Sequence, residues 1–137
     1  MRFVPMIVLA LMMAINFVRG SIHAFAPDGG AHSIAGLDIT QNSRTILSLF
    51  AVMGFHQIVL GLFQLYVVTF RRDLILLALS LQTIETAFGV ANLYFYRTMP
   101  VVVPGAAFNA CILAVLVVTT ALVARQKWPP GETRTQP

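Results

Sequence analysis

Polar side chains occur in the middle of the long apolar segments of this chain, and one of them is a carboxyl group. Glu85 is surrounded by apolar residues, and in a bilayer an ionised side chain at that depth costs on the order of 3 kcal/mol unless it finds a partner or a proton. Residues at comparable positions that could supply a partner are Gln57, His56, Gln82, Asn16 and Asn109. Such a set could relay protons or bind the polar head of a ligand.

A structural role for the same residues is the alternative. A protonated Glu85 hydrogen-bonded to Gln57 would hold two membrane helices together without any further function. This reading is favoured because the helices hold no second carboxylate. Transporters usually also have broken helices around a central site.

Arg19, near the outer end of the first apolar segment, could also have either a functional or a structural role. Its guanidinium group could bind a lipid phosphate or an acidic partner. Because long basic side chains commonly extend to the membrane surface, we expect Arg19 to reach the interface instead.

The rest of the sequence offers little chemistry. His23, Asp28, His32 and Asp38 could gather around a metal ion, but their spacing matches no closed metal site, and we expect solvated loop residues. The chain has a single cysteine and no nucleophile, phosphate-binding or dinucleotide-binding motif. We therefore expect no catalytic residue, no metal and no cofactor, which favours a non-enzymatic protein, although a bound lipid or quinone would fit.

Positioning these residues requires membrane-spanning helices. Of the 137 residues, 58% are hydrophobic and only 10% are charged, too few to cover a water-soluble globule. Four apolar stretches each reach the roughly 20 helical residues that a hydrocarbon core requires: residues 3–25, 46–70, 74–96 and 101–124. The sequence predicts an all-α, integral membrane, antiparallel four-helix bundle over residues 1–125, with an outer cap at about 26–45.

The first stretch has a second interpretation, as a cleaved signal peptide. Ala24-Phe25-Ala26 has the small-residue pattern of a cleavage site, but Arg19 would then lie between the apolar core and the site, and Pro27 would follow the cut. A membrane-spanning helix is the preferred interpretation.

Basic residues indicate the orientation, because the side richer in Lys and Arg is normally cytoplasmic. One side holds Arg2, Arg71, Arg72, Arg125, Lys127 and Arg134, and the other holds Arg19, Arg44 and Arg97. Both termini are therefore predicted inside, with residues 126–137 as a polar cytoplasmic tail. The net charge of +4 forms no stripe or dense patch, so nucleic acid is not an expected partner.

The short link Arg71-Arg72-Asp73 predicts that the second and third helices are antiparallel neighbours. Folding the chain there sets small and polar residues level with one another: Gly54 with Gly89, Gln57 with Glu85, Gly61 with Gln82, and Gln64 with Ala78. We expect this to be the seam between the two helices, since small residues and buried amides bring membrane helices together. Leu81, Ile84 and Phe88 are left to face lipid or another subunit.

Several motifs resemble those of small bacterial four-helix membrane proteins loosely allied to the DoxX-like group. They are Ala26-Pro27-Asp28-Gly29-Gly30, Ile34-Ala35-Gly36-Leu37-Asp38, Gly54-Phe55-His56-Gln57, the run from Leu60 to Leu65, Arg71-Arg72 and Pro104-Gly105. The resemblance implies a multi-pass protein of the bacterial inner membrane. Some DoxX-like proteins are subunits of quinone-linked oxidoreductases, but this sequence has no cysteine pair or haem-ligand pair to carry electrons.

Three functional hypotheses follow. The leading one is a non-enzymatic accessory or structural component that packs in membrane lipid against itself or a larger membrane complex. The second is a binder of a quinone, lipid or other amphipathic molecule near Glu85 and Gln57. The third and weakest is proton-coupled transport.

Overall fold

The computed structural model describes residues 3–96 and 105–126, and within these ranges the chain is helical apart from turns and one loop. Its main elements are α1 (Val4–Phe25), α2 (Ser43–Phe70), α3 (Ile75–Ala91) and α4 (Ala106–Arg125). A 3₁₀ turn at Arg72–Leu74 precedes α3, and a π-helical turn at Asn92–Tyr96 extends it. Each of the four helical spans is long and apolar enough to cross a membrane, which indicates a multi-pass membrane protein.

The expected and observed helices differ mainly at their ends. α2 begins at Ser43, before the expected start at Ile46, with Asn42 as the preceding residue in a left-handed conformation. α4 begins at Ala106. The expected start of the fourth helix at Val101 lies outside the described residues, as does most of the predicted tail.

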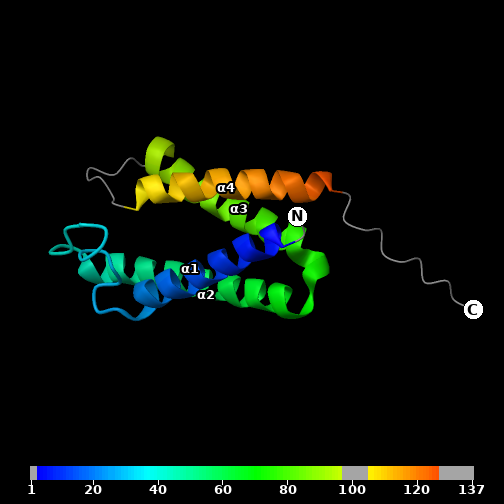
Figure 1. The fold of residues 1–137 in the computed structure, drawn as a ribbon. Helices are drawn as coiled ribbons and strands as arrows, with labels where there is room; N and C mark the ends of the chain where they lie inside the picture. The colour runs from blue at the N-terminus through cyan, green and yellow to red at the C-terminus, as the bar shows by residue number, and fades with distance from the viewer. Residues whose placement is uncertain (1–2, 97–104, 127–137) are drawn as a thin grey trace, which may run out of the picture.

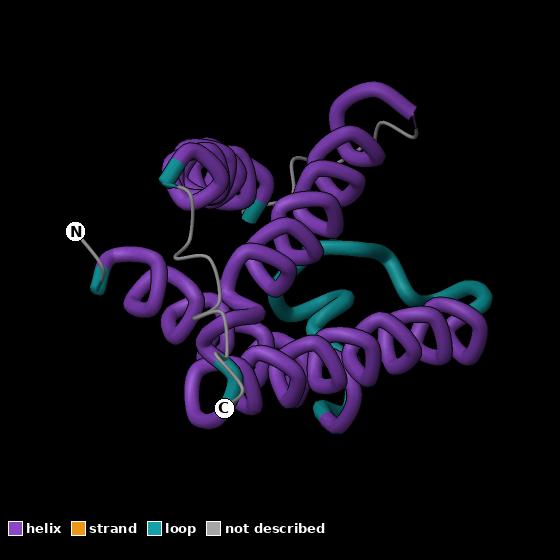
Figure 2. Tube along the Cα trace, turned by 90° about the vertical axis from the view of Figure 1, so that its right-hand side faces the viewer, coloured by secondary structure: helices purple, strands orange, loops and turns teal. Residues whose placement is uncertain are grey.

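The helices associate as two pairs. α1 packs along α2 and α3 packs against α4, while contacts between the two pairs are sparser. Figure 1 shows α1 and α2 side by side and α4 above them, with α3 running obliquely between. The view turned by 90° in Figure 2 shows the same separation of the pairs. The pairs meet at one end and diverge toward the other, which leaves space between them.

A small apolar core joins the pairs where they meet. Its fully buried members are Leu9, Val67, Ile75, Ala78, Leu79, Leu116 and Val123, contributed by all four helices. Most other large apolar side chains point outward, including Leu81, Ile84 and Phe88, as predicted. An outward-facing apolar surface is unfavourable in water but suits hydrocarbon.

The seam of small residues was predicted between the wrong pair of helices. Gly54 is buried, but a Cβ there would lie 2.6 Å from the carbonyl oxygen of Gly20 and 2.6 Å from the backbone nitrogen of Ala24, both on α1. The nearest neighbours of Gly61 are Asn16 and Phe17, also on α1. The α2 stripe therefore lets α1 approach closely, and Gly89 on α3 is exposed.

Residues 26–42 form a segment of turns and loop that we call the cap segment. Gly29, Gly30 and Gly36 all have positive φ values there. The carboxylate of Asp28 accepts hydrogen bonds from the backbone N–H of Gly30 (3.0 Å) and of Ser33 (2.7 Å). These contacts fold the segment back over the ends of α1 and α2, next to the space between the pairs.

Candidate functional site

A cavity of about 440 Å³ lies between the two helix pairs. It extends from the middle of α1 and α3 to the cap segment, where Gly30, Ile34 and Leu37 line it. The apolar part of its wall comes from all four helices and includes Met12, Ile15, Phe50, Met53, Leu93, Phe108 and Ile112. This volume falls within the range of roughly 300–1,000 Å³ that is typical of small-molecule sites.

Three buried amides close the inner end of the cavity and tie three helices together. The Asn16 side chain on α1 donates from Nδ2 to Oε1 of Gln64 (3.0 Å) and to Oε1 of Gln82 (2.7 Å). Gln64 on α2 also donates from Nε2 to Oε1 of Gln82 on α3, at 2.6 Å. We call these three residues the amide network, and its hydrogen bonds are made wholly within the protein.

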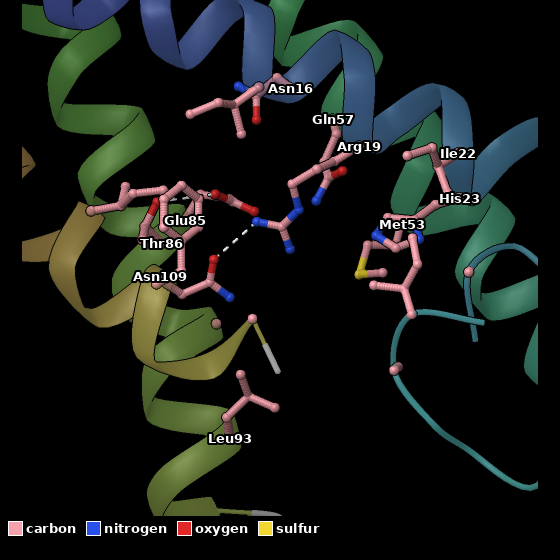
Figure 3. Close-up of a pocket in the computed structure, with 18 of the residues that line it drawn as sticks. Asn16, Arg19, Ile22, His23, Met53, Gln57, Glu85, Thr86, Leu93 and Asn109 are labelled. Carbon is pink, nitrogen blue, oxygen red and sulfur yellow. Dashed lines mark hydrogen bonds between the residues drawn. The ribbon is translucent and has the colours of Figure 1, made fainter. Parts of the chain in front are cut away.

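Glu85 extends this network toward the cavity. Its Oε2 accepts a hydrogen bond from Nε2 of Gln82 (3.0 Å) and a longer one from Oγ1 of Thr86 (3.4 Å). The side chain is only partly buried and lines the cavity. Figure 3 shows its carboxyl group pointing into the space between α1 and α4.

Arg19 also lines this cavity. Its Nη1 donates a hydrogen bond of 3.0 Å to Oδ1 of Asn109 on α4, as Figure 3 shows. Among the described residues, an ion pair joins Arg71 to Asp73. Arg19 and Glu85 line the same cavity, but no nitrogen of Arg19 lies within 4 Å of a carboxylate oxygen of Glu85. The cavity thus presents a cation and an acidic group that are not neutralised by each other.

Gln57 lines the same cavity but takes no part in the amide network. The residue is 5% exposed, and its Oε1 is buried without a hydrogen-bond partner in the described part of the chain. An unsatisfied buried polar group costs about 1–3 kcal/mol. Gln57 Oε1 is also closed off from the cavity, so a ligand would bond to it only after the side chain turned.

The structure brings together most of the residues singled out from the sequence. Asn16, Arg19, Gln57, Gln82, Glu85 and Asn109 all line the cavity. His56 does not, because it lies on the exposed face of α2. No pattern in the sequence singles out Phe50 and Met53 as site residues, whereas the contribution of Thr86 could have been inferred from its place beside Glu85.

The polar residues of the cap segment and its neighbour His23 hold local turns. His23 Nδ1 lies 2.7 Å from the carbonyl oxygen of Gly29, and His32 Nδ1 lies 3.2 Å from that of Leu37. Asp38 accepts from the backbone N–H of Thr40 at 2.9 Å. Within residues 3–96 and 105–126, no three His, Cys, Asp or Glu side chains gather closely enough to hold a metal ion.

The arrangement can hold an amphipathic molecule. One part of the cavity offers hydrogen-bond donors on Arg19 and acceptors on Glu85 and Gln57, and the remaining wall is largely apolar. No known protein family, characterised protein or solved structure matches this chain. Its function therefore has to be inferred from the chemistry of the cavity.

Proposed function

We propose that this chain is a membrane protein that binds an amphipathic small molecule, such as a lipid or a quinone, in the cavity between its helix pairs. The polar end of the ligand lies against Arg19, Glu85 and Gln57, and its apolar part lies against the aliphatic and aromatic wall. The observation that carries the proposal is a largely apolar cavity lined by both Arg19 and Glu85, which do not pair with each other, next to the unpartnered amide oxygen of Gln57.

A purely structural role accounts for these residues less well. The amide network of Asn16, Gln64 and Gln82 already joins α1, α2 and α3 with internal hydrogen bonds. Gln57 adds nothing to that network, and a side chain kept only for packing would be apolar, because an unsatisfied amide is destabilising. The accessory role thus becomes secondary to ligand binding, and proton-coupled transport remains the weakest hypothesis.

The topology is part of the proposal. The core joins Leu9 near the start of α1, Val67 near the end of α2, Ile75 at the start of α3 and Val123 near the end of α4. This alternation supports an antiparallel bundle. Together with the distribution of basic residues, it supports a topology with both termini in the cytoplasm, the cap segment outside, and the cavity open toward the outer half of the membrane.

The cellular setting follows from the same argument. A multi-pass protein of this kind would reside in a cell membrane, and the resemblance of its motifs to those of bacterial proteins supports the inner membrane as its location. Membership of the DoxX-like group stays a prediction, as do self-association and membership of a larger complex.

Native mass spectrometry of gently extracted protein tests the proposal. Gly89 lines the cavity, and no described atom lies within 4 Å of a Cβ built there, so Gly89→Phe should fill space without disturbing the helix. We expect the wild type and the matched control Gly89→Ala to retain a ligand that Gly89→Phe loses. Equal retention by all three proteins, or none by the wild type, would contradict ligand binding in this cavity.

A further inference from the structure

The opposite charges of Arg19 and Glu85 constrain the chemical class of the ligand. Both side chains line the cavity, they come from different helices, and no ion pair joins them. We propose that the ligand is a zwitterionic lipid whose phosphate binds Arg19 and whose primary ammonium group binds Glu85 and Gln57. This inference rests on the proposed function and specifies its ligand.

Charge balance favours a zwitterion over other ligands. Arg19 is a cation and Glu85 is an acidic group, and each needs a partner because it is partly removed from water. A ligand with a single charge would match one side chain and leave the other unmatched. A neutral ligand would match neither, whereas a zwitterion matches both and leaves the buried site with no net charge.

The hydrogen-bonding groups distinguish among zwitterions. Only Nη1 of Arg19 is recorded in a bond, so other guanidinium N–H groups can donate to a phosphate. For the ammonium group, Oε1 of Glu85 accepts no hydrogen bond from the described residues, and Oε1 of Gln57 can accept one once its side chain turns toward the ligand. Acceptors need a donor, and a primary ammonium group carries three N–H donors while a trimethylammonium group carries none.

An apolar groove beside the cavity indicates that the zwitterion is a lipid. The groove, of about 300 Å³, lies between α1 and α4 and is lined by Ala14, Ile15, Val18, Arg19 and Phe108. It shares Ile15, Arg19 and Phe108 with the larger cavity. Val18 is 62% exposed and Phe108 is 56% exposed, so the groove opens onto the lipid-facing surface.

The continuity of cavity and groove defines the pose of the ligand. Arg19 lies on the wall of both, at the point where a polar head in the cavity would join an acyl chain in the groove. A water-soluble zwitterion would leave the groove empty. The occupant of the groove is thus the acyl chain of the same lipid whose head lies in the cavity.

A competition experiment tests the head group. Delipidated protein in detergent is mixed with equal amounts of phosphatidylethanolamine, phosphatidylcholine and phosphatidylglycerol with identical acyl chains, and native mass spectrometry measures which lipid is retained. We expect phosphatidylethanolamine to be retained about tenfold over the other two, as one charge-assisted hydrogen bond would give. Equal retention of phosphatidylcholine or phosphatidylglycerol would overturn this inference but leave the proposed function intact.

Two variants test whether Arg19 and Glu85 are responsible for the preference for phosphatidylethanolamine. Glu85→Gln keeps the shape of the side chain, Arg19→Gln replaces the cation by a shorter polar side chain, and each should abolish the preference for phosphatidylethanolamine. The controls Arg44→Gln and Asp73→Asn remove the same charges at exposed positions outside the cavity and should leave it unchanged. A preference that survives both cavity variants would show that the lipid binds elsewhere and would overturn the inference.

Free phosphoethanolamine separates a lipid from a soluble ligand. As a competitor without an acyl chain, it should fail to displace phosphatidylethanolamine at equal concentration. Complete displacement would show that the groove contributes nothing and would overturn the assignment to a lipid. Thermal unfolding of each variant in the same detergent distinguishes a loss of lipid binding from a loss of the folded structure.

Discussion

Arg19 on α1 donates a hydrogen bond of 3.0 Å to Oδ1 of Asn109 on α4, and this bond spans the opening between the two helix pairs. It holds the guanidinium group over the cavity that also contains Glu85. Basic side chains inside membranes are costly and are commonly functional. The pair therefore supports the proposal that the space between the helix pairs is a binding site.

Gln57 and His56 are adjacent in the sequence, but we expect a substitution at Gln57 to affect ligand binding and a substitution at His56 to have no effect. Gln57→Leu removes the unpartnered amide, so it should leave stability unchanged or raise it by about 1 kcal/mol while weakening ligand retention. His56→Ala alters an exposed residue outside the cavity and should change neither. Thermal unfolding and native mass spectrometry of both variants measure this. Strong destabilisation by Gln57→Leu without loss of ligand would favour a structural role for Gln57.

Gln82 should be the most sensitive member of the amide network. Its Oε1 accepts from both Asn16 and Gln64, so Gln82→Met leaves Nε2 of Gln64 unpaired and Asn16 with one bond fewer, and should destabilise the fold by about 1–3 kcal/mol. Chemical unfolding in detergent measures the difference. A change below about 0.5 kcal/mol would mean that the donors find other partners, as often happens for hydrogen bonds in membranes.

Gly54 should tolerate no side chain. A Cβ at this position would lie 2.6 Å from backbone atoms of α1, so Gly54→Ala must push α1 and α2 apart and should lower stability by about 1–3 kcal/mol. Gly89→Ala is the matched control, because it has open space and should raise stability by about 0.5–1 kcal/mol through helix propensity. Similar unfolding temperatures for the two variants would contradict the observed α1–α2 contact.

The cap segment should resist acid. Hydrogen bonds from the backbone N–H of Ser33 and of Gly30 lower the pKa of Asp28 from 3.8 to about 2. A lowered pKa means that the stabilising charge is present above pH 3.8 and is lost as the pH falls through about 2. Hydrogen exchange at Gly30 and Ser33 should therefore show constant protection factors down to about pH 4, while Asp28→Ala should remove the protection at all pH values. Protection already lost at pH 5 would contradict these hydrogen bonds.

The membrane-spanning helices could be predicted from the sequence, because each one depends only on the apolar composition of its own stretch. Twenty consecutive apolar residues require a hydrocarbon environment whatever their neighbours are, and the four helices follow the apolar stretches closely within the described ranges. The outward positions of Leu81, Ile84 and Phe88 were predicted for the same reason. The polar residues that line the cavity were also recognisable, because polar groups are rare in such stretches.

The pairing of helices could not be predicted in the same way. The short link at Arg71–Asp73 constrains only the last turn of α2 and the first turn of α3, and beyond them the helices diverge. The stripe of Gly54 and Gly61 is equally suited to any close partner, and the small residue Gly20 on α1 provides the better fit. A 100° difference in direction around α2 likewise separates buried Gln57 from exposed His56.

An experimental structure of the protein in lipid nanodiscs containing phosphatidylethanolamine tests the central claim most directly. The account predicts elongated density with its polar end between Arg19, Glu85 and Gln57 and its apolar end against Phe108 on the side of α1 and α4. A cavity that is closed by packing of the two helix pairs, or that holds only water, would contradict it.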